Sequence, residues 1–543
     1  MNSATHSYWP ADTTRSVLET TVGSVLREAA GAAPERAAIA AWTAIPGQRR
    51  TWTYAALLRD AERAAQALLA RFAPGEHVAV YAPNSAEWLL LELGAGLAGI
   101  VLVTVNPASR ARELEYILRQ SRSAGLIHVS EFRGNPMSEW VEQVRPQLSG
   151  LREVIQFEAW AEFVDGAGDP DALLTVKPDD AAQIQYTSGT TGSPKGALLH
   201  HRGLTNNARA YAELLALGDG DVYAHAMPFF HTAGCGLSTL GAIQRRANHA
   251  FLPAFDAGRL LELLERERAT HLLGVPTMLI ALLEHPNRRR HDLSALRLVV
   301  SGGASVPPEL VRAIEAELNV GFTVVYGQTE ASPLITQTRL DDGPVDRANT
   351  IGRPVPQIAV KIIEPRSGEI VPVDTVGELC TRGYHIMHGY FDNPDATAAA
   401  ICGAGWLHTG DLATMDARGY CRIAGRLKDM VIRGGENLFP AEIEAVLIEH
   451  TAVAEAAVIG VPDRLMGEEL AAFIRITADP PGIDELRAHV KNRLAGPKAP
   501  RYWVFLDEFP LTGSGKIQKF VLRDRWGRGE YRFIDAAPLA RRG

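Results

Sequence analysis

The chain has few cysteines, no long apolar run and no excess of positive charge. Its 543 residues include 4 cysteines, which form neither a CxxC pair nor another metal-ligand spacing. No apolar run approaches the ~18 residues that cross a bilayer, and the polar stretch from Met1 to Arg15 lacks the apolar core of a signal peptide. Few cysteines in a long chain are typical of a reducing compartment. We therefore expect a cytoplasmic protein without an integral membrane segment.

The charge balance argues against nucleic acid as a partner. The formal net charge is −8, and we interpret the short basic run Arg288-Arg289-Arg290 as the solvated end of a helix. An apolar content of 46% and a charged content of 22% are ordinary for a globular protein. The length exceeds what one hydrophobic core usually supports, so two or more domains are expected.

Most of the chain alternates helix and strand patterns. Thr53 can cap a helix that runs to Phe72, and Ser85 can cap the next helix. Strands are predicted over 77–82, 100–105, 126–129, 297–300 and 322–326. This alternation predicts a largely parallel sheet covered by helices, hence an α/β fold. Shorter strands at 359–363, 377–381 and 420–423 follow, and beyond 426–440 lies an α+β pattern of small-domain size.

The segment Tyr186-Thr187-Ser188-Gly189-Thr190-Thr191-Gly192-Ser193-Pro194-Lys195-Gly196 has the composition of a phosphate-binding loop. Its glycines let backbone N–H groups form an anion nest, its hydroxyls add donors, and its lysine adds a mobile positive charge. The loop follows a strand-like run, and α/β proteins bind ligands at the ends of strands. It is not a Walker A loop, which has Ser or Thr after Gly-Lys. A flexible linker is the alternative, although a linker does not need the Pro-Lys-Gly ending.

Four further segments concentrate polar groups. Tyr326-Gly327-Gln328-Thr329-Glu330 offers an aromatic ring, a hydroxyl and a carboxylate, and a carboxylate beside phosphates suggests Mg²⁺; a helix N-terminus capped by Thr and Glu is the alternative. In Trp406-Leu407-His408-Thr409-Gly410-Asp411 the aspartate either belongs to a turn or accepts hydrogen bonds from ribose hydroxyls. The charged, glycine-rich run 425–437 lies at the predicted domain boundary. Lys516, in the segment 511–517, lies either in an exposed turn or in a loop that delivers a positive charge to a distant site.

Together, in this order and at these separations, the five segments resemble the adenylate-forming superfamily of acyl-CoA synthetases, peptide-synthetase adenylation domains and beetle luciferases. The resemblance covers roughly residues 20–525, and 428–437 and 515–519 are most similar to medium-chain fatty acyl-CoA synthetases. It implies a large N-terminal domain (1–427) of helix-covered sheets with a β-subdomain. It also implies a small, mobile α+β C-terminal domain (428–543).

The resemblance implies a first step in which a carboxylate attacks the α-phosphate of ATP, giving an acyl-adenylate and pyrophosphate. This step brings anions together, so it needs cations and oriented N–H donors. The residues that would hold the β- and γ-phosphates are Thr187, Ser188, Gly189, Thr190, Thr191 and Lys195. Those implied around the nucleoside are Tyr326, Gly327 and Gly302-Gly303-Ala304 for adenine, and Asp411 and Arg426 for ribose.

Catalysis is assigned by the same resemblance to four residues. Thr329 would contact the α-phosphate, and Glu330 would hold Mg²⁺ together with Thr190. Lys516 would reach from the small domain to bridge the carboxylate and α-phosphate oxygens. His231, in Pro228-Phe229-Phe230-His231-Thr232, would lie beside the substrate carboxylate; a core histidine bonded to backbone is the alternative.

The acyl site is expected around that segment. The residues implied to line it are Met227, Phe229, Phe230, His231, Cys235, Gly327 and Leu334, and core packing is the alternative for the apolar members. The spacing of His385 and His388 would suit a metal on a helix, but we expect a strand and turn there and reject that site.

A second step requires a thiol where pyrophosphate and Lys516 had been. The resemblance implies that the small domain rotates about a hinge at Lys428, whose alternative is a solvated linker lysine. Arg433, Gly434 and Gly435 would then line a tunnel for CoA. One departure is Gly496-Pro497-Lys498-Ala499-Pro500, where the proline before the lysine is unusual for the family and bears on CoA contacts.

We therefore expect an AMP-forming acyl-CoA synthetase that uses ATP, Mg²⁺ and CoA on a medium-chain fatty or similar hydrophobic acid. The alternatives are transfer of the acyl group to a carrier-protein thiol or to an amine, and a catalytically inactive acyl-nucleotide sensor. The presence of Lys516, Glu330 and Lys195 argues against the sensor. We expect a monomer or a homodimer.

Overall fold

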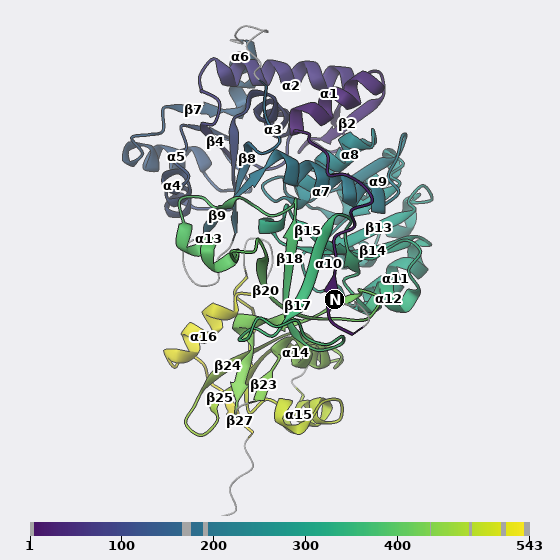
Figure 1. Cartoon of the computed structure of the whole chain (residues 1–543), viewed down its shortest axis with the longest axis vertical. Helices are drawn as coiled ribbons and strands as arrows, with labels where there is room; N and C mark the ends of the chain where they lie inside the picture. The colour runs from purple at the N-terminus through teal and green to yellow at the C-terminus, as the bar shows by residue number, and fades with distance from the viewer. Residues whose placement is uncertain are drawn as a thin grey trace, which may run out of the picture.

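The computed structural model describes residues 5–165, 175–187, 194–434, 436–476, 481–511 and 517–536. Within these residues the strands form four sheets, with helices packed against them (Figure 1). Three sheets belong to the larger part of the chain, and the fourth to the smaller C-terminal part at the bottom of Figure 1. The predicted α/β class, with a large helix-covered part and a small α+β part, is confirmed.

The first sheet has seven strands and is mainly parallel. In spatial order they are β19 (Gly389–Tyr390), β9 (Lys195–His200), β8 (Ala181–Thr187), β5 (Val101–Val105), β4 (His77–Tyr81), β6 (Gly125–His128) and β7 (Glu153–Gln156). From β8 to β7 neighbouring strands are parallel, whereas β9 and β19 are added antiparallel. The three strands predicted at the start of the chain therefore lie in the middle of one sheet.

The second sheet has nine strands. In spatial order they are β16 (Arg353–Pro354), β15 (Leu334–Gln337), β14 (Gly321–Gly327), β13 (Leu298–Gly302), β12 (His271–Leu273), β10 (Val222–His225), β11 (Asn248–Phe251), β2 (Ala37–Trp42) and β3 (Arg49–Thr53). The six strands from β14 to β2 are parallel, and antiparallel strands flank them on both sides. The predicted strands near 300 and 325 are thus neighbours, with Gly302 opposite Val325.

The other two sheets are smaller. The antiparallel β-subdomain consists of β1 (Tyr8–Trp9), β17 (Ile358–Ile363), β18 (Gly377–Gly383), β20 (Leu407–Met415) and β21 (Cys421–Arg426). The C-terminal sheet consists of β23 (Glu436–Leu438), β22 (Val431–Arg433), β25 (Gly467–Ile476), β26 (Tyr502–Phe505) and β27 (Ile534–Asp535), with β24 (Val453–Asp463) paired to β25.

Helices connect these strands, and their caps follow from local sequence. Thr53 accepts a hydrogen bond from the backbone N–H of Ala56, and Ser85 accepts one from Trp88, so both predicted helices begin where expected. The helices of the larger part are α1 (Val22–Ala32), α2 (Tyr54–Leu69), α3 (Ala86–Ala98), α4 (Ala111–Gln120), α5 (Met137–Val144), α6 (Trp160–Asp165), α7 (His201–Leu214), α8 (Gly241–Gln244), α9 (Ala257–Arg266), α10 (Pro276–Glu284), α11 (Pro308–Leu318), α12 (Pro344–Asn349) and α13 (Pro394–Ala400). Those of the C-terminal part are α14 (Pro440–Ile448), α15 (Ile483–Lys491) and α16 (Lys519–Gly527).

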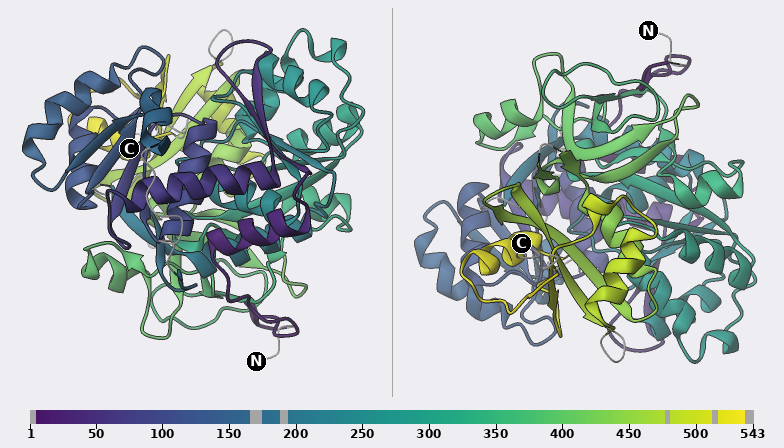
Figure 2. Two further views of the ribbon diagram at one scale, coloured as in Figure 1. Left: turned by 90° about the horizontal axis from the view of Figure 1, so that it is seen from above. Right: turned by 90° about the horizontal axis from the view of Figure 1, so that it is seen from below.

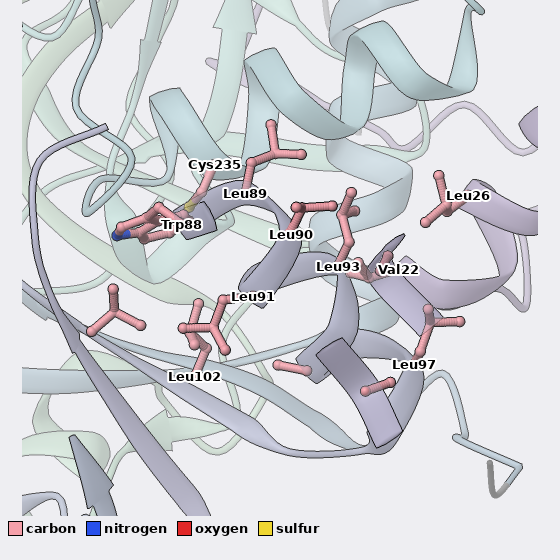
Figure 3. Close-up of a cluster of buried hydrophobic side chains, with 14 of the residues drawn as sticks. Val22, Leu26, Trp88, Leu89, Leu90, Leu91, Leu93, Leu97, Leu102 and Cys235 are labelled. Carbon is pink, nitrogen blue, oxygen red and sulfur yellow. The ribbon is translucent and has the colours of Figure 1, made fainter. Parts of the chain in front are cut away.

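The main core lies where helices pack between the two large sheets. Side chains of α1, α2 and α3 meet side chains of β2 from one sheet and β4 and β5 from the other. Figure 3 shows part of this cluster, with the leucines of α3 beside Val22, Leu26 and Cys235. Every residue of α3 except Glu87 is buried, which explains why this segment is apolar nearly all round rather than on one face.

The C-terminal part has its own core. Val431, Ile443, Val458 and Trp503 are among its buried residues, and the sheet and its helices face the viewer in the right panel of Figure 2. A boundary at Lys428 remains a prediction. No helix within the described ranges is long and apolar enough to cross a membrane.

Candidate active site

The predicted phosphate loop joins two antiparallel strands. Thr187 at the end of β8 lies opposite Lys195 at the start of β9, so the two strands that flank the loop form a β-hairpin. The Tyr116 hydroxyl donates a hydrogen bond to the Pro194 carbonyl at 2.9 Å, which fixes one end of the loop. Ser188, Gly189, Thr190 and Thr191 lie outside the described residues, so their contacts with phosphate remain predictions.

A cation, a phenol and a carboxylate lie next to one another at the start of β9. The Lys195 ammonium lies 5.1 Å from the centre of the Tyr390 ring, and the Tyr390 hydroxyl donates to Glu330 Oε1 at 2.7 Å. Burial and the Glu330 carboxylate raise the pKa of Tyr390, so the phenol keeps its proton and acts as the donor. Tyr390 therefore links two segments, at Lys195 and Glu330, that lie far apart in sequence. Tyr390 itself was missed, because a tyrosine in a short edge strand carries no signal of its own.

The turn that carries Glu330 requires a glycine at position 327, where the backbone of Pro333 approaches closely. An added Cβ at Gly327 would lie 1.8 Å from the Pro333 carbonyl oxygen, which also accepts the N–H of Gln328 at 2.8 Å. A single 3₁₀ turn, Thr329–Ala331, separates β14 from β15, and it has no side-chain cap. The alternative prediction of a capped helix at this point is therefore wrong.

Asp411 connects the second large sheet to the β-subdomain. Its Oδ2 accepts a hydrogen bond from the Tyr326 hydroxyl at 2.7 Å, and its Oδ1 pairs with Arg426 Nε at 2.8 Å. The Asp411 side chain is 6% exposed and the Arg426 side chain 50%. Asp411 lies within β20 rather than in a turn. Burial and this carboxylate raise the pKa of Tyr326, so the phenol stays a donor.

The glycines predicted to flank adenine lie at the end of β13. Position 302 requires glycine, because an added Cβ would lie 2.3 Å from the Val325 carbonyl oxygen on β14. Gly303 follows at φ +74°, a conformation that favours glycine, and Ala304 is exposed. These residues lie at the same sheet end as Tyr326, where open α/β sheets bind ligands.

The residues predicted for the acyl site fall into two groups. Met227 and Leu334 share an apolar cluster with Tyr326, against which Val275 and Met278 also pack. Phe229 instead belongs to the main core, with its ring centre 5.2 Å from that of Trp88 and 4.7 Å from that of Phe251. Both Phe230 and His231 are partly exposed, with ring centres 4.4 Å apart. An acyl-site role for these residues remains a prediction.

Cys235 lies in a buried polar network that the sequence analysis missed. Its thiol accepts a hydrogen bond from Gln185 Nε2 at 3.1 Å, and Gln183 Nε2 donates to Glu92 Oε1 at 2.9 Å. Burial raises the pKa of Glu92 well above its ordinary value, because the charged carboxylate loses its contact with water. The available signal was Glu92, an acid that stands between leucines in the apolar part of α3.

The C-terminal residues predicted for the second step are only partly described. Lys428 lies in a 3₁₀ turn, Leu427–Asp429, where Asp429 pairs with Arg523 at 2.7 Å. Arg433 Nε pairs with the buried Glu469 at 2.6 Å. Gly435 and Lys516 lie outside the described residues. Leu511 and Ile517 form a β-bridge that closes the ends of the segment carrying Lys516.

Two smaller predictions concern a proline and a histidine pair. Pro497 fits into a 3₁₀ turn, Gly496–Lys498, and Lys498 pairs with Glu442 at 2.6 Å. His385 is buried and lies 2.9 Å from Thr381 Oγ1, whereas His388 lies 2.8 Å from the Asp179 carbonyl oxygen. The two histidines have different partners and lie in turns between β18 and β19 rather than on a helix.

Glu330 fits the requirements of a Mg²⁺ ligand. Glu330 Oε1 accepts a hydrogen bond from Tyr390. Glu330 Oε2 has no hydrogen-bond partner among the residues that the structure describes, so it is available to a cation. Mg²⁺ prefers oxygen ligands and keeps one or two carboxylates plus substrate phosphates. With Glu330 as its protein ligand, the ion would neutralise phosphate charge next to Lys195.

Two family models match this chain. The model of the AMP-binding enzymes matches residues 26–391, and that of the AMP-binding enzyme C-terminal domain matches residues 442–516. The chain belongs to the AMP-binding enzyme family. The two matched ranges include the hairpin, Glu330 and Tyr390 on one side, and most of the C-terminal sheet on the other.

Relatives match over nearly the full length. The Putative acyl-CoA synthetase YngI of Bacillus subtilis is 41% identical over 94% of this chain and 97% of its own. The mitochondrial Medium-chain acyl-CoA ligase ACSF2 of Rattus norvegicus is 35% identical over 96% of this chain and 89% of its own. Among solved structures, ATP-bound MatB from Rhodopseudomonas palustris superposes with a TM-score of 0.85 at 30% identity, covering 94% of this chain and 99% of that one. This AMP-binding enzyme is therefore an adenylate-forming acyl-CoA synthetase, and enzymes of this kind use ATP, Mg²⁺ and CoA.

Proposed function

We propose that this synthetase activates a medium-chain fatty acid, or a comparably hydrophobic acid, as the acyl-adenylate and transfers the acyl group to CoA. The observation that carries the proposal is the arrangement of Lys195, Tyr390 and Glu330 at the end of the phosphate hairpin. The 35% identity to a medium-chain acyl-CoA ligase favours this acid class. The apolar cluster around Met227 and Leu334 is consistent with it.

In the first step the acid carboxylate attacks the α-phosphate and pyrophosphate leaves. Lys195, with the hairpin residues 187–191, stabilises the negative charge that the leaving group acquires. Glu330 and Thr190 would hold Mg²⁺, and the bound ion would neutralise phosphate charge. Thr329 and Lys516 contact the α-phosphate, where charge develops.

The nucleoside is positioned by groups that the fold already orients. Tyr326 holds Asp411 at 2.7 Å, so the carboxylate is fixed before a ribose hydroxyl donates to it. Arg426 pairs with the other oxygen and is half-exposed, which leaves its guanidinium accessible to a ligand. Gly302, Gly303 and Ala304, at the end of β13, leave room for the adenine ring beside Tyr326.

The second step transfers the acyl group from AMP to a thiol. We infer that rotation at Lys428 removes Lys516 from the site and brings Arg433, Gly434 and Gly435 toward it. In support, the short segment that joins the two parts is a single turn, and Gly434 is exposed at φ +59°. Glu469 holds Arg433 in place, so this residue would move with its sheet as a rigid unit.

A panel of acids tests the proposed substrate. Pyrophosphate release and acyl-CoA formation would be measured with straight-chain acids of increasing length, a branched acid, an aromatic acid and malonate. We expect kcat/KM to peak at medium chain length and to be lowest for malonate, whose second charge would be buried without a partner. A maximum with an aromatic or a charged acid would contradict the proposed acid class but leave the synthetase activity intact.

Transfer to a carrier-protein thiol or to an amine is the alternative for the second step. Two relatives are named as an acyl-CoA synthetase and an acyl-CoA ligase, which favours CoA over these acceptors. Adding CoA to the pre-formed acyl-adenylate separates the two, because thioester must accumulate under the first proposal. We also propose a cytoplasmic monomer or homodimer, which cell fractionation and light scattering would check.

A further inference from the structure

Three potential metal ligands meet on neighbouring strands of the β-subdomain. Glu378 and Cys380 lie on β18, and His408 lies on β20 directly opposite Cys380. A carboxylate oxygen, the thiol sulfur and an imidazole nitrogen all lie within 4.8 Å of one another. Glu378 and Cys380 are buried, and the His408 side chain is 31% exposed. Among the residues that the structure describes, this is the one group of three such side chains so arranged.

The distances suit a thiophilic cation. Cys380 Sγ lies 3.6 Å from His408 Nδ1, and two zinc bonds of about 2.3 Å and 2.1 Å at a tetrahedral angle also separate sulfur from nitrogen by about 3.6 Å. Glu378 Oε2 lies 2.9 Å from the same nitrogen, with a proton between them. A metal would replace that proton after the oxygen moves back by about half an ångström.

The carboxylate is already oriented for this role. Glu378 Oε1 accepts the backbone N–H of Gly410 at 3.1 Å, which leaves Oε2 as the oxygen directed at His408. Outer contacts of this kind fix the orientation of a ligand and raise metal affinity. The hydrogen bond from Gly410 therefore orients the Glu378 carboxylate in the absence of a metal.

Cys402 lies on the accessible side and would complete the set after a side-chain movement, because its thiol is not among the ligand atoms that lie within 4.8 Å of one another. Its thiol interacts with the His408 side chain and packs against the apolar cluster that contains Cys380 and Trp406. It is partly exposed, whereas Cys380 is fully buried, so a cation can enter past it. Two thiolates, one imidazole and one carboxylate form a ligand set that selects zinc over magnesium or calcium.

Nearby cations offset the charge of such a site. Two thiolates and a carboxylate around a divalent ion leave one net negative charge. Lys361 Nζ lies 4.5 Å and Arg382 Cζ 4.8 Å from the centre of the Trp406 ring beside the cluster. Trp406 belongs to the same cluster as Cys380, so these positive charges would offset part of the excess.

We propose that Glu378, Cys380, Cys402 and His408 bind a thiophilic divalent cation, with Zn²⁺ as the natural probe, at a site separate from that of the catalytic Mg²⁺. Binding releases the two thiol protons and the proton held between His408 and Glu378, and no electron is transferred. His408 lies three residues before Asp411 on β20, and Glu378 accepts a hydrogen bond from the backbone N–H of Gly410. Zinc therefore stiffens the strand that carries the ribose contact.

Metal binding by the full-length enzyme tests this proposal. The protein is reduced, stripped with a chelator and titrated with Co²⁺, followed by competition with Zn²⁺. We expect one ion per chain and a thiolate-to-cobalt absorption band that zinc abolishes. Absence of the band, with no zinc retained at protein-equivalent concentrations, would overturn the proposal.

Matched cysteine variants locate the site. Cys380→Ala should weaken zinc binding by at least about 100-fold, more than the loss of an outer partner costs, and Cys402→Ala should weaken it and reduce the absorption band. Cys421→Ala is the control, because this buried cysteine on β21 lies outside the cluster. Binding that neither Cys380→Ala nor Cys402→Ala changes would refute the site. If Cys380→Ala does not fold, Cys402→Ala decides, because its side chain is partly exposed.

Discussion

Gly327→Ala is expected to inactivate the enzyme without unfolding it. The added Cβ would lie 1.8 Å from the Pro333 carbonyl oxygen and 2.8 Å from its carbon, and both belong to the backbone. Ordinary van der Waals contact begins at 3.4 Å, so β14 and the segment before β15 must separate by about 1.6 Å. No side-chain rotation can relieve this contact.

That displacement affects both ends of the site. Tyr326 precedes Gly327 and holds Asp411 at 2.7 Å, and Glu330 follows it and accepts from Tyr390 at 2.7 Å. Hydrogen-bond distances between heavy atoms reach only ~3.2 Å. Neither contact can therefore survive a shift of this size. A misplacement of about 1 Å can cost 10²-fold in rate. We therefore expect kcat/KM for ATP to fall at least about 100-fold, or roughly 2.7 kcal/mol.

Pyrophosphate release at saturating acid, with ATP varied, measures this loss. Overpacking costs roughly 1–3 kcal/mol of stability, so thermal unfolding should shift by only a few degrees. Gly343→Ala is the matched control, since no heavy atom lies within 4 Å of its added Cβ. If folded Gly327→Ala kept activity within threefold of the wild type, the turn would not position the site and the reasoning would fail.

Three further substitutions test other parts of the argument. Lys516→Ala should abolish pyrophosphate release yet largely spare thioester formation from supplied acyl-adenylate; equal loss of both half-reactions would contradict two domain positions. Tyr390→Phe removes the donor to Glu330 and should raise the Mg²⁺ and ATP concentrations for half-maximal rate about tenfold, as expected for a ~1.5 kcal/mol hydrogen bond to a charged group, with an unchanged rate as the contrary result. Because burial raises the pKa of Glu92, the folded chain holds a proton there that the unfolded chain releases above the ordinary value of 4.5, so stability falls as pH rises. Glu92→Gln should therefore raise Tm relative to the wild type, and more at pH 8 than at pH 5; the same shift at both pH values would speak against a buried, protonated carboxyl.

Local rules predicted the fold where local contacts decide it. Thr53 and Ser85 cap their helices through bonds to residues three positions ahead, so the sequence near each cap is sufficient. The helix that Thr53 caps, α2, ends at Leu69 rather than at the predicted Phe72. Phe72 is buried, but it lies beyond the last helical residue. The edge strands β1 and β19, of two residues each, depend on distant partners and had no signal in the sequence.

The sequence pointed to several residues of the site but not to the side-chain contacts between distant segments. Glycine and hydroxyl patterns pointed to the hairpin and to Gly327, because these residue types meet local backbone needs. Tyr390 and the Glu92 network were missed, since their partners lie 60 and 91 positions away. The placement of Phe229 in the core also depends on distant rings, at Trp88 and Phe251, which no local pattern identifies.

The described contacts of the site join the ends of three sheets. Lys195 and Tyr390 belong to the seven-stranded sheet, Tyr326 to the nine-stranded sheet and Asp411 to the β-subdomain. Closely packed sheets move as rigid layers, so a site assembled from their ends cannot reshape itself between adenylation and thioester formation. Under the proposed mechanism the change between the two steps comes from the C-terminal part, whose separate sheet follows the turn at Leu427–Asp429. Substitutions at contacts between the sheets should therefore impair adenylation, and substitutions on the exposed face around Gly434 should impair thioester formation.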